Sequence, residues 1–215
     1  MKINQIKLAV ILVGVVHFNL CLAAIPEKQI ASFAAQIKIA QDTQKPLSAR
    51  WQALMKSSEL ANYEQLQEIK KFTRSSDWYM RNAALVALEK IGVDHAVDEA
   101  KLLLKDKALV VRSAAVDVIA KRLTLENRQV LAQELNKSYN FKNSKSLWIR
   151  PKIFSIIAAK SNFDDRMFFA KYLFDHDENI QKIAVQKLEQ FTEVKLSGES
   201  AVVEWQKYVK KKGWL

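Results

Sequence analysis

A unit of about thirty residues recurs along the chain, and such a repeat constrains the fold more strongly than any single motif. Its marker is an apolar residue followed by a basic or polar one. Four markers are spaced 31, 38 and 31 residues apart: Met80-Arg81, Val111-Arg112, Ile149-Arg150 and Ile180-Gln181. A further step of 31 towards the N-terminus reaches Ala49-Arg50. The spacing predicts an array of similar structural units.

Apolar residues follow each marker at fixed distances. Counted from the second residue of the marker, they stand three, four and seven positions further on. They are Ala84, Leu85 and Leu88; Ala115, Val116 and Ile119; Ile153, Phe154 and Ile157; and Ala184, Val185 and Leu188. These offsets, with the apolar residue of the marker itself, lie on one face of a helix with 3.6 residues per turn. Each marker is therefore predicted to open an amphipathic helix.

A second helical pattern precedes each marker, for example Ala96, Ala100 and Leu103. Between the two patterns, six residues before the second residue of the marker, stands a residue that ends or caps helices: Ser75, Asp106, Ser144 or Asp175. Each unit is thus predicted to be helix, turn, helix. One such pair cannot bury its apolar stripe alone, so neighbouring pairs must stack. With only four Gly and three Pro in 215 residues, the expected fold is an all-α solenoid.

Four segments carry a family resemblance: WYMRNAALVALEKIG, LVVRSAAVDVIAKR, LWIRPKIFSIIAAK and NIQKIAVQKLEQF. They resemble the second helices of HEAT repeats, in which an apolar residue, a basic residue and spaced Ala and Leu recur. The spacing of 31 is shorter than in most HEAT repeats and is similar to that of compact bacterial HEAT-like repeats, such as those of phycobilisome lyase subunits. The resemblance covers residues 61–194 and implies an α-α superhelix there.

The two ends are expected to differ from the repeats, because a terminal unit has one face in water. Residues 25–60 are predicted to form a degenerate N-terminal capping repeat, with Ser57 in place of the usual apolar residue. Residues 195–215 are predicted to form a C-terminal capping helix. The longer third spacing predicts an extra polar loop over residues 139–146, and Pro151 predicts that the next helix begins late, near Trp148, or bends there.

Residues 1–24 resemble a secretory signal peptide. Two lysines precede an apolar run from Leu8 to Val16, and small residues offer cleavage after Ala23 or Ala24. The run is too short to span a bilayer, which takes about 20 residues. An uncleaved anchor and acylation of Cys21 stay open as alternatives, the second disfavoured by the bulky Leu20. The expected location is the periplasm or the cell exterior.

The sequence contains few residues that could support catalysis or bind a metal. Beyond the leader only His95 and His176 are present, without cysteine, and no phosphate-binding glycine loop exists. The acidic clusters Asp164-Asp165 and Asp175–Glu178 fall where helices begin, where negative charge complements the helix dipole. The sequence therefore predicts a protein that is not an enzyme and holds no cofactor and no metal.

The arginines of the markers, Arg81, Arg112 and Arg150, form a periodic ladder. They invite a phosphate-binding interpretation, since the net charge is +11, or +9 after loss of the two leader lysines. The alternative, which the resemblance favours, is that each guanidinium pairs with a carboxylate or carbonyl of its own or the next unit. We expect this structural role. Arginines exposed to solvent would instead favour phosphate binding.

The outer face of the second helices is the candidate protein-binding surface. Its residues stand one, five and nine positions after the second residue of each marker. Apart from Pro151 and Ala159, its residues are Asn82, Val86 and Lys90; Ser113, Asp117 and Lys121; Ser155; and Lys182, Gln186 and Gln190. The mixture of small, neutral and charged side chains leaves room for a helix or peptide. It is too weakly basic to predict a nucleic-acid partner.

A membrane surface is a further possible partner, through the basic C-terminal segment. Lys207, Lys210, Lys211 and Lys212 alternate there with Trp205, Tyr208 and Trp214. The same segment can instead close the array, which is the interpretation that a solenoid favours. The sequence therefore predicts an exported, non-catalytic scaffold or adaptor that binds another protein. The alternatives are a binder of an anionic envelope polymer or membrane surface, and a helical-repeat enzyme.

Overall fold

The computed structural model describes residues 26–196 and 200–215, and this part of the chain is all-α, as the sequence predicts. Its β-structure is one hairpin of two-residue strands. The predicted signal peptide, residues 1–24, lies outside the described residues. Within them, no helix combines the length and the apolar character needed to cross a bilayer.

The helices form pairs that succeed one another along the chain. The first helices of the pairs are α1 (Glu27–Gln41), α3 (Leu66–Lys70) continued by the 3-10 turn η1 (Lys71–Arg74), α5 (Val93–Leu103), α7 (Leu125–Glu134) and α9 (Arg166–Tyr172). The second helices are α2 (Leu47–Leu60), α4 (Trp78–Ile91), α6 (Leu109–Lys121), α8 (Ile149–Ala159) and α10 (Glu178–Thr192). A last helix, α11 (Ala201–Lys211), follows.

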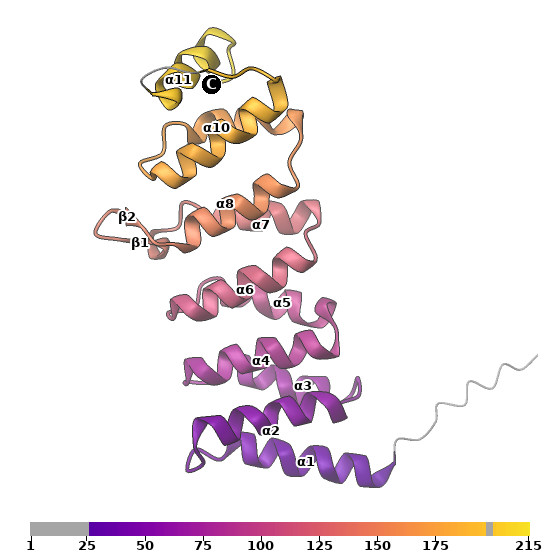
Figure 1. The fold of residues 1–215 in the computed structure, drawn as a ribbon. Helices are drawn as coiled ribbons and strands as arrows, with labels where there is room; N and C mark the ends of the chain where they lie inside the picture. Colours follow the sequence, from indigo (N-terminus) through magenta and orange to yellow (C-terminus); the bar gives the residue numbers. More distant parts are fainter. Residues whose placement is uncertain (1–25, 197–199) are drawn as a thin grey trace, which may run out of the picture.

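The pairs are stacked in the order of the sequence, from α1 at one end to α11 at the other (Figure 1). Each second helix contacts the next, from α2 through α4, α6 and α8 to α10. The first helices pack mainly against the second helices of their own and neighbouring pairs. The second helices therefore form a continuous layer along one side of the stack.

The core follows the offsets seen in the sequence. The apolar residues at these offsets on α4, α6, α8 and α10 are at most 7 % exposed. They belong to one continuous cluster that runs from Phe33 in α1 to Val209 in α11. Since adjacent pairs share this cluster, each pair buries its apolar stripe against its neighbours.

The first pair accommodates the polar residue that interrupts its stripe. Ser57 is fully buried in α2, and its hydroxyl donates a hydrogen bond of 2.9 Å to the carbonyl of Ala53. A buried hydroxyl with such a partner costs little. The stripe of α2 thus remains a packing surface for α4.

The extra residues of the third spacing fold as a hairpin, not as an irregular loop. The 3-10 turn η2 (Ser138–Asn140) leads into β1 (Phe141–Lys142) and β2 (Lys145–Ser146), which project from the side of the stack (Figure 1). Asn143 and Ser144 have φ of 49° and 61° at the two-residue turn between the strands. The prediction that Ser144 caps or ends a helix is wrong, because its left-handed backbone closes a hairpin.

Helix α8 begins at Ile149, directly after Trp148, where the sequence places its start. Pro151 stands in the first turn of the helix, where its missing amide hydrogen has no intrahelical acceptor to lose. The helix therefore contains the proline without interruption.

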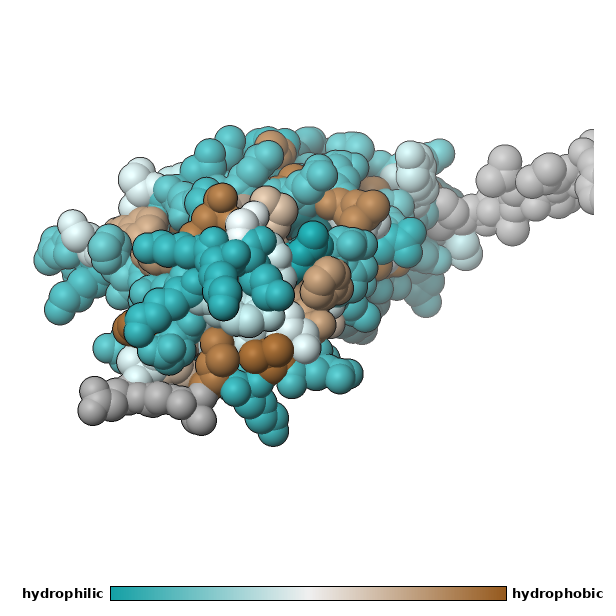
Figure 2. All heavy atoms as spheres, turned by 90° about the horizontal axis from the view of Figure 1, so that it is seen from above, coloured by the Kyte–Doolittle hydropathy of each residue, from teal (hydrophilic) through white to brown (hydrophobic). Residues whose placement is uncertain are grey.

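Helix α11 covers the end of the stack. Trp205 and Val209 are fully buried, and the side-chain amide of Gln206 donates to the carbonyl of Leu173 at 2.8 Å. Lys210, Lys211 and Lys212 remain exposed. Seen from this end, the surface is mainly hydrophilic with only small hydrophobic spots (Figure 2), as expected for a helix that closes an apolar core.

Substitution of Leu85 by Asp should unfold the stack, because it places an unpaired charge at a fully buried position between neighbouring pairs. We expect a loss of several kcal/mol, roughly the largest class of single-residue effects, measured by urea denaturation. Leu102→Asp is the matched control, since Leu102 is 61 % exposed on α5, and it should change stability little. Equal stability of the two variants would contradict the shared core.

Candidate protein-binding surface

The arginine ladder lies inside the protein. Arg81, Arg112 and Arg150 are 6 %, 4 % and 1 % exposed. A buried guanidinium must find acceptors for its N–H groups. Each of these side chains finds them in the turns that lead into the second helices.

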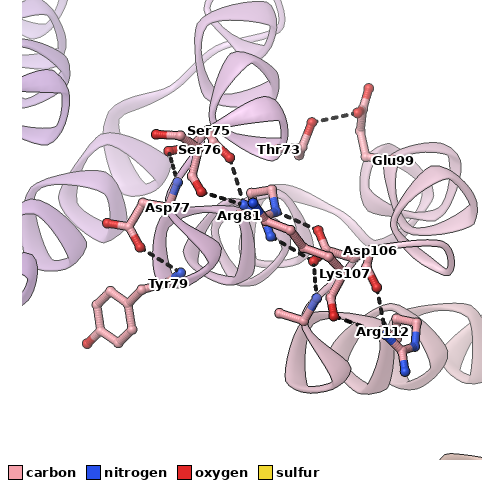
Figure 3. A network of polar contacts seen from close by, with 11 residues as sticks. Thr73, Ser75, Ser76, Asp77, Tyr79, Arg81, Glu99, Asp106, Lys107 and Arg112 are labelled. Atoms are coloured by element: carbon pink, nitrogen blue, oxygen red, sulfur yellow. Dashed lines mark hydrogen bonds and ion pairs between the residues drawn. The ribbon is translucent and has the colours of Figure 1, made fainter. Parts of the chain in front are cut away.

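Arg81 shows the pattern most fully (Figure 3). Its Nη1 donates to the carbonyl oxygens of Ser75 at 2.8 Å and Ser76 at 3.0 Å, in the turn of its own pair. Its Nη2 donates to Asp106 Oδ1 at 2.7 Å, in the turn of the next pair. Asp106 Oδ1 also accepts from the amide of Ala108 at 2.7 Å. One guanidinium therefore closes two turns and ties two pairs together.

The pattern recurs along the stack. Arg150 donates to both carboxylate oxygens of Asp175, at 3.2 and 2.6 Å. Arg50 of the first pair donates to Asp77 at 3.3 Å. At the last pair a glutamine replaces the arginine, and Gln181 Nε2 donates to the carbonyl of Asp175 at 2.6 Å.

Arg112 departs from the pattern, because the inserted segment supplies neutral acceptors. Its Nη1 donates to the carbonyl of Asp106 at 2.7 Å, its Nη2 to that of Tyr139 at 2.9 Å, and its Nε to Asn140 Oδ1 at 3.2 Å. Burial lowers the pKa of Arg112, and the more distant acidic groups offset only part of that. Burial and a hydrogen bond to Glu134 raise the pKa of Tyr139.

The ladder carboxylates are held in their charged form. Burial raises the pKa of Asp106, but hydrogen bonds from Arg81 and the Ala108 amide outweigh it, so this pKa lies below its usual range. The pKa of Asp175 is lowered in the same way, by Arg150 and the Asp177 amide against burial. Arg81 and Arg150 are thus paired with carboxylates inside the turns, and the three ladder arginines are too buried to offer an exposed phosphate site.

The predicted binding residues occupy the outer face of the second helices. Most are exposed there, namely Lys90, Asp117, Lys121, Ser155, Lys182, Gln186 and Gln190. Asn82 and Val86 are half-buried. Ser113 is a correction to the predicted surface: it is only 7 % exposed, because Lys152 from α8 lies over it and donates to its Oγ at 2.7 Å.

Part of this face is hollowed into a groove of about 560 Å³ between α4 and α6. Apolar and small side chains line it, with charged residues at its rim: Leu85, Val86, Glu89, Ala114, Asp117, Val118, Ala120 and Lys121. Three of the predicted residues, Val86, Asp117 and Lys121, therefore meet at one concave site. Ser155 and the residues of α10 are not part of it.

Charges on this face are paired across neighbouring helices. Lys121 of α6 pairs with Glu89 of α4, and Lys152 of α8 with Asp117 of α6 at 2.7 Å. Lys90 pairs with Glu59 of α2 at 3.2 Å, and the hydrogen bond and charge of Lys90 lower the pKa of Glu59. The face therefore carries mixed charge with no continuous basic track.

Aromatic residues that the sequence reading missed extend the surface over the first two pairs. Trp51 of α2 and Tyr79 of α4 are half-buried, with ring centroids 4.8 Å apart. Met55 stands one turn further along α2 and is also half-buried. Trp51 and Met55 occupy offsets one and five in the first pair, so the same rule, applied to the capping unit, would have found them.

Acidic and histidine side chains do not form a metal-binding cluster among residues 26–196 and 200–215. No three His, Asp or Glu side chains gather there to hold an ion. The acidic clusters cap helices, as the sequence predicts: Asp165 completes a capping box with Asn162, and Asp177 accepts from the amide of Asn179 at the start of α10. Asp175 of the second cluster pairs instead with Arg150.

Comparison with known proteins adds no family. No protein-family model and no curated protein matches this sequence.

Replacement of Arg81 by Ala should destabilise the protein by about 3–5 kcal/mol, because it leaves Asp106 buried without its partner. The matched control is Arg122→Ala, which breaks an exposed pair with Asp94, 58 % and 66 % exposed, and should cost no more than about 1 kcal/mol. Urea denaturation measures both. Similar losses in the two variants would contradict the role of the ladder.

Stability should fall as the pH is lowered below about 4, the ordinary range of Asp. The pKa values of Asp106 and Asp175 are depressed in the folded state, so near that pH the unfolded chain binds more protons and protonation favours unfolding. Urea midpoints measured from neutral to acidic pH should show this slope. The double variant Asp106→Asn/Asp175→Asn should flatten this slope, whereas the control Asp98→Asn, at an exposed position, should leave it unchanged. An unchanged slope in the double variant would show that Asp106 and Asp175 do not cause the acid sensitivity.

Proposed function

We propose that this chain is an α-solenoid of HEAT-like repeats, with the first pair and α11 as its caps. Support comes from the recurrence of the same helix pair, from the shared core and from the ladder side chain in the same place in each pair. The residues at equivalent core positions differ in size from pair to pair but stay apolar and buried, as expected where one unit is repeated.

We propose further that the protein is a non-catalytic adaptor that binds a segment of another protein on the outer face of its second helices. The observation that carries this proposal is the groove between α4 and α6, with an apolar lining and charges of both signs at its rim. An amphipathic helix or extended peptide satisfies such a groove by burying apolar side chains and pairing at the edges. From the leader-like N-terminal sequence, we place the adaptor in the periplasm or outside the cell.

Two other functions are less well supported at this groove. An anionic polymer would need exposed cations, but the arginines are buried and Lys90 and Lys121 are paired with carboxylates. An enzyme would need activated groups in the groove, whose only titratable side chains are Glu89, Asp117 and Lys121. In the described structure each of these three is ion-paired.

A photo-crosslinking amino acid placed at Val86 in the full chain tests the adaptor function in intact cells. We expect one protein to be crosslinked at Val86, and no crosslink from the same probe at Leu102, which is more exposed than Val86 but lies on the first helices. Val86→Arg should then weaken binding of the purified partner by about tenfold or more, as at a central interface residue. Equal crosslinking from both positions, or none from Val86, would overturn the proposal.

A further inference from the structure

A row of lysines follows one edge of the stack. Because first and second helices alternate in direction, all turns leading into second helices lie on the same side, where Figure 1 also places the hairpin. We call this side the turn edge. Lys71 on this edge pairs with Glu68. The other exposed lysines are Lys45, Lys105, Lys107, Lys137, Lys142, Lys145 and Lys171. None of them forms an ion pair with a carboxylate in the part of the chain that the structure describes.

The acidic residues of this edge offset the lysines only in part. Asp77, Asp106 and Asp175 each accept from a buried ladder arginine. The carboxylates at the turns that pair with no ladder arginine are Asp42, Asp177 and Glu178, which are fewer than the lysines. Along this edge the positive charge faces water, whereas on the groove face it is paired.

Large apolar side chains accompany the lysines. Leu47, Trp78, Val110 and Trp148 stand at the starts of α2, α4, α6 and α8, next to the turns, and are 44–55 % exposed. Four successive second helices therefore each have an exposed apolar residue at or next to their first residue. Single exposed apolar residues are common on protein surfaces, but a row of them beside unpaired lysines marks an interaction surface.

The hairpin extends the edge outwards. Lys142 and Lys145 flank its two-residue turn and are exposed. Phe141 at its base lies under the guanidinium of Arg150, with 4.3 Å between Cζ and the ring centroid. The two lysines are thus held on a base that is anchored to the ladder.

We propose that the turn edge docks on an anionic phospholipid bilayer. Lysines at this edge would meet the headgroups, and Trp78 and Trp148 would occupy the interfacial zone that tryptophan favours. Aliphatic side chains distinguish this partner from a single-stranded nucleic acid. Leu47 and Val110 can be buried among acyl chains but cannot stack on bases in the way that aromatic residues do. The groove between α4 and α6 is a different surface, so this inference is independent of the adaptor function.

Vesicle binding by the full-length protein tests the inference. Vesicles containing phosphatidylglycerol should bind it more tightly than vesicles of phosphatidylcholine alone. Added salt should weaken binding to the phosphatidylglycerol vesicles and leave binding to the phosphatidylcholine vesicles unchanged. Lys142→Gln/Lys145→Gln should reduce binding to the anionic vesicles by about tenfold or more. The control Lys160→Gln/Lys195→Gln removes the same charge from exposed positions near the ends of second helices, away from this edge, and should change binding less than about twofold. All variants share the apolar N-terminal run, which contributes equally to each comparison.

Tryptophan emission locates the contact. On binding, the emission should shift to the blue, and Trp78→Phe/Trp148→Phe should abolish the shift, whereas Trp214→Phe in the basic C-terminal segment should not. Loss of the shift in Trp214→Phe alone would assign the contact to the C-terminal segment and overturn the proposal. Equal binding to both vesicle types, equal loss in the two lysine variants, or binding of single-stranded DNA in place of vesicles would also overturn it.

Discussion

A guanidinium buried away from water needs an acceptor for each N–H group, and this requirement organises the whole stack. Arg50, Arg81 and Arg150 meet it by reaching from their own turn to the carboxylate of the next. The same carboxylates accept backbone amides, so turn geometry and pair-to-pair spacing are set together. The apolar core supplies the driving force for stacking, and the ladder sets the register in which neighbouring pairs meet.

The sequence predicts the repeating part of this structure well, because burial on a helix recurs every 3.6 residues and leaves a readable stripe. It fails where a role depends on a neighbour in space. Ser144 has the composition of a helix cap but closes a hairpin, and Asn140, far from the expected offset, replaces a ladder carboxylate. Ser113 faces outward by its offset, yet Lys152 of the next pair covers it. Only the packing of two units together reveals these contacts.

The positive charge of the chain is unevenly distributed. On the second-helix face, lysines pair with carboxylates of adjacent helices and frame an apolar groove. On the turn edge, the buried arginines pair with Asp77, Asp106 and Asp175, and most of the exposed lysines have no ion-pair partner among the described residues. The interaction that holds the turns together thus also separates a nearly neutral face from a cationic edge. A stack of helix pairs can in this way present two surfaces of different chemistry.

The glutamine at position 181 stands where the other pairs have an arginine. Among the described residues Gln181 bonds to its own turn, and α11 packs on α10 in the next place. Duplication of the second pair would keep each guanidinium opposite a carboxylate, because Arg81 would reach the copied Asp77 and the copied arginine would reach Asp106. At the fifth pair the cation is replaced by a neutral amide, so an acidic turn placed after it would lack the arginine that Asp77, Asp106 and Asp175 have.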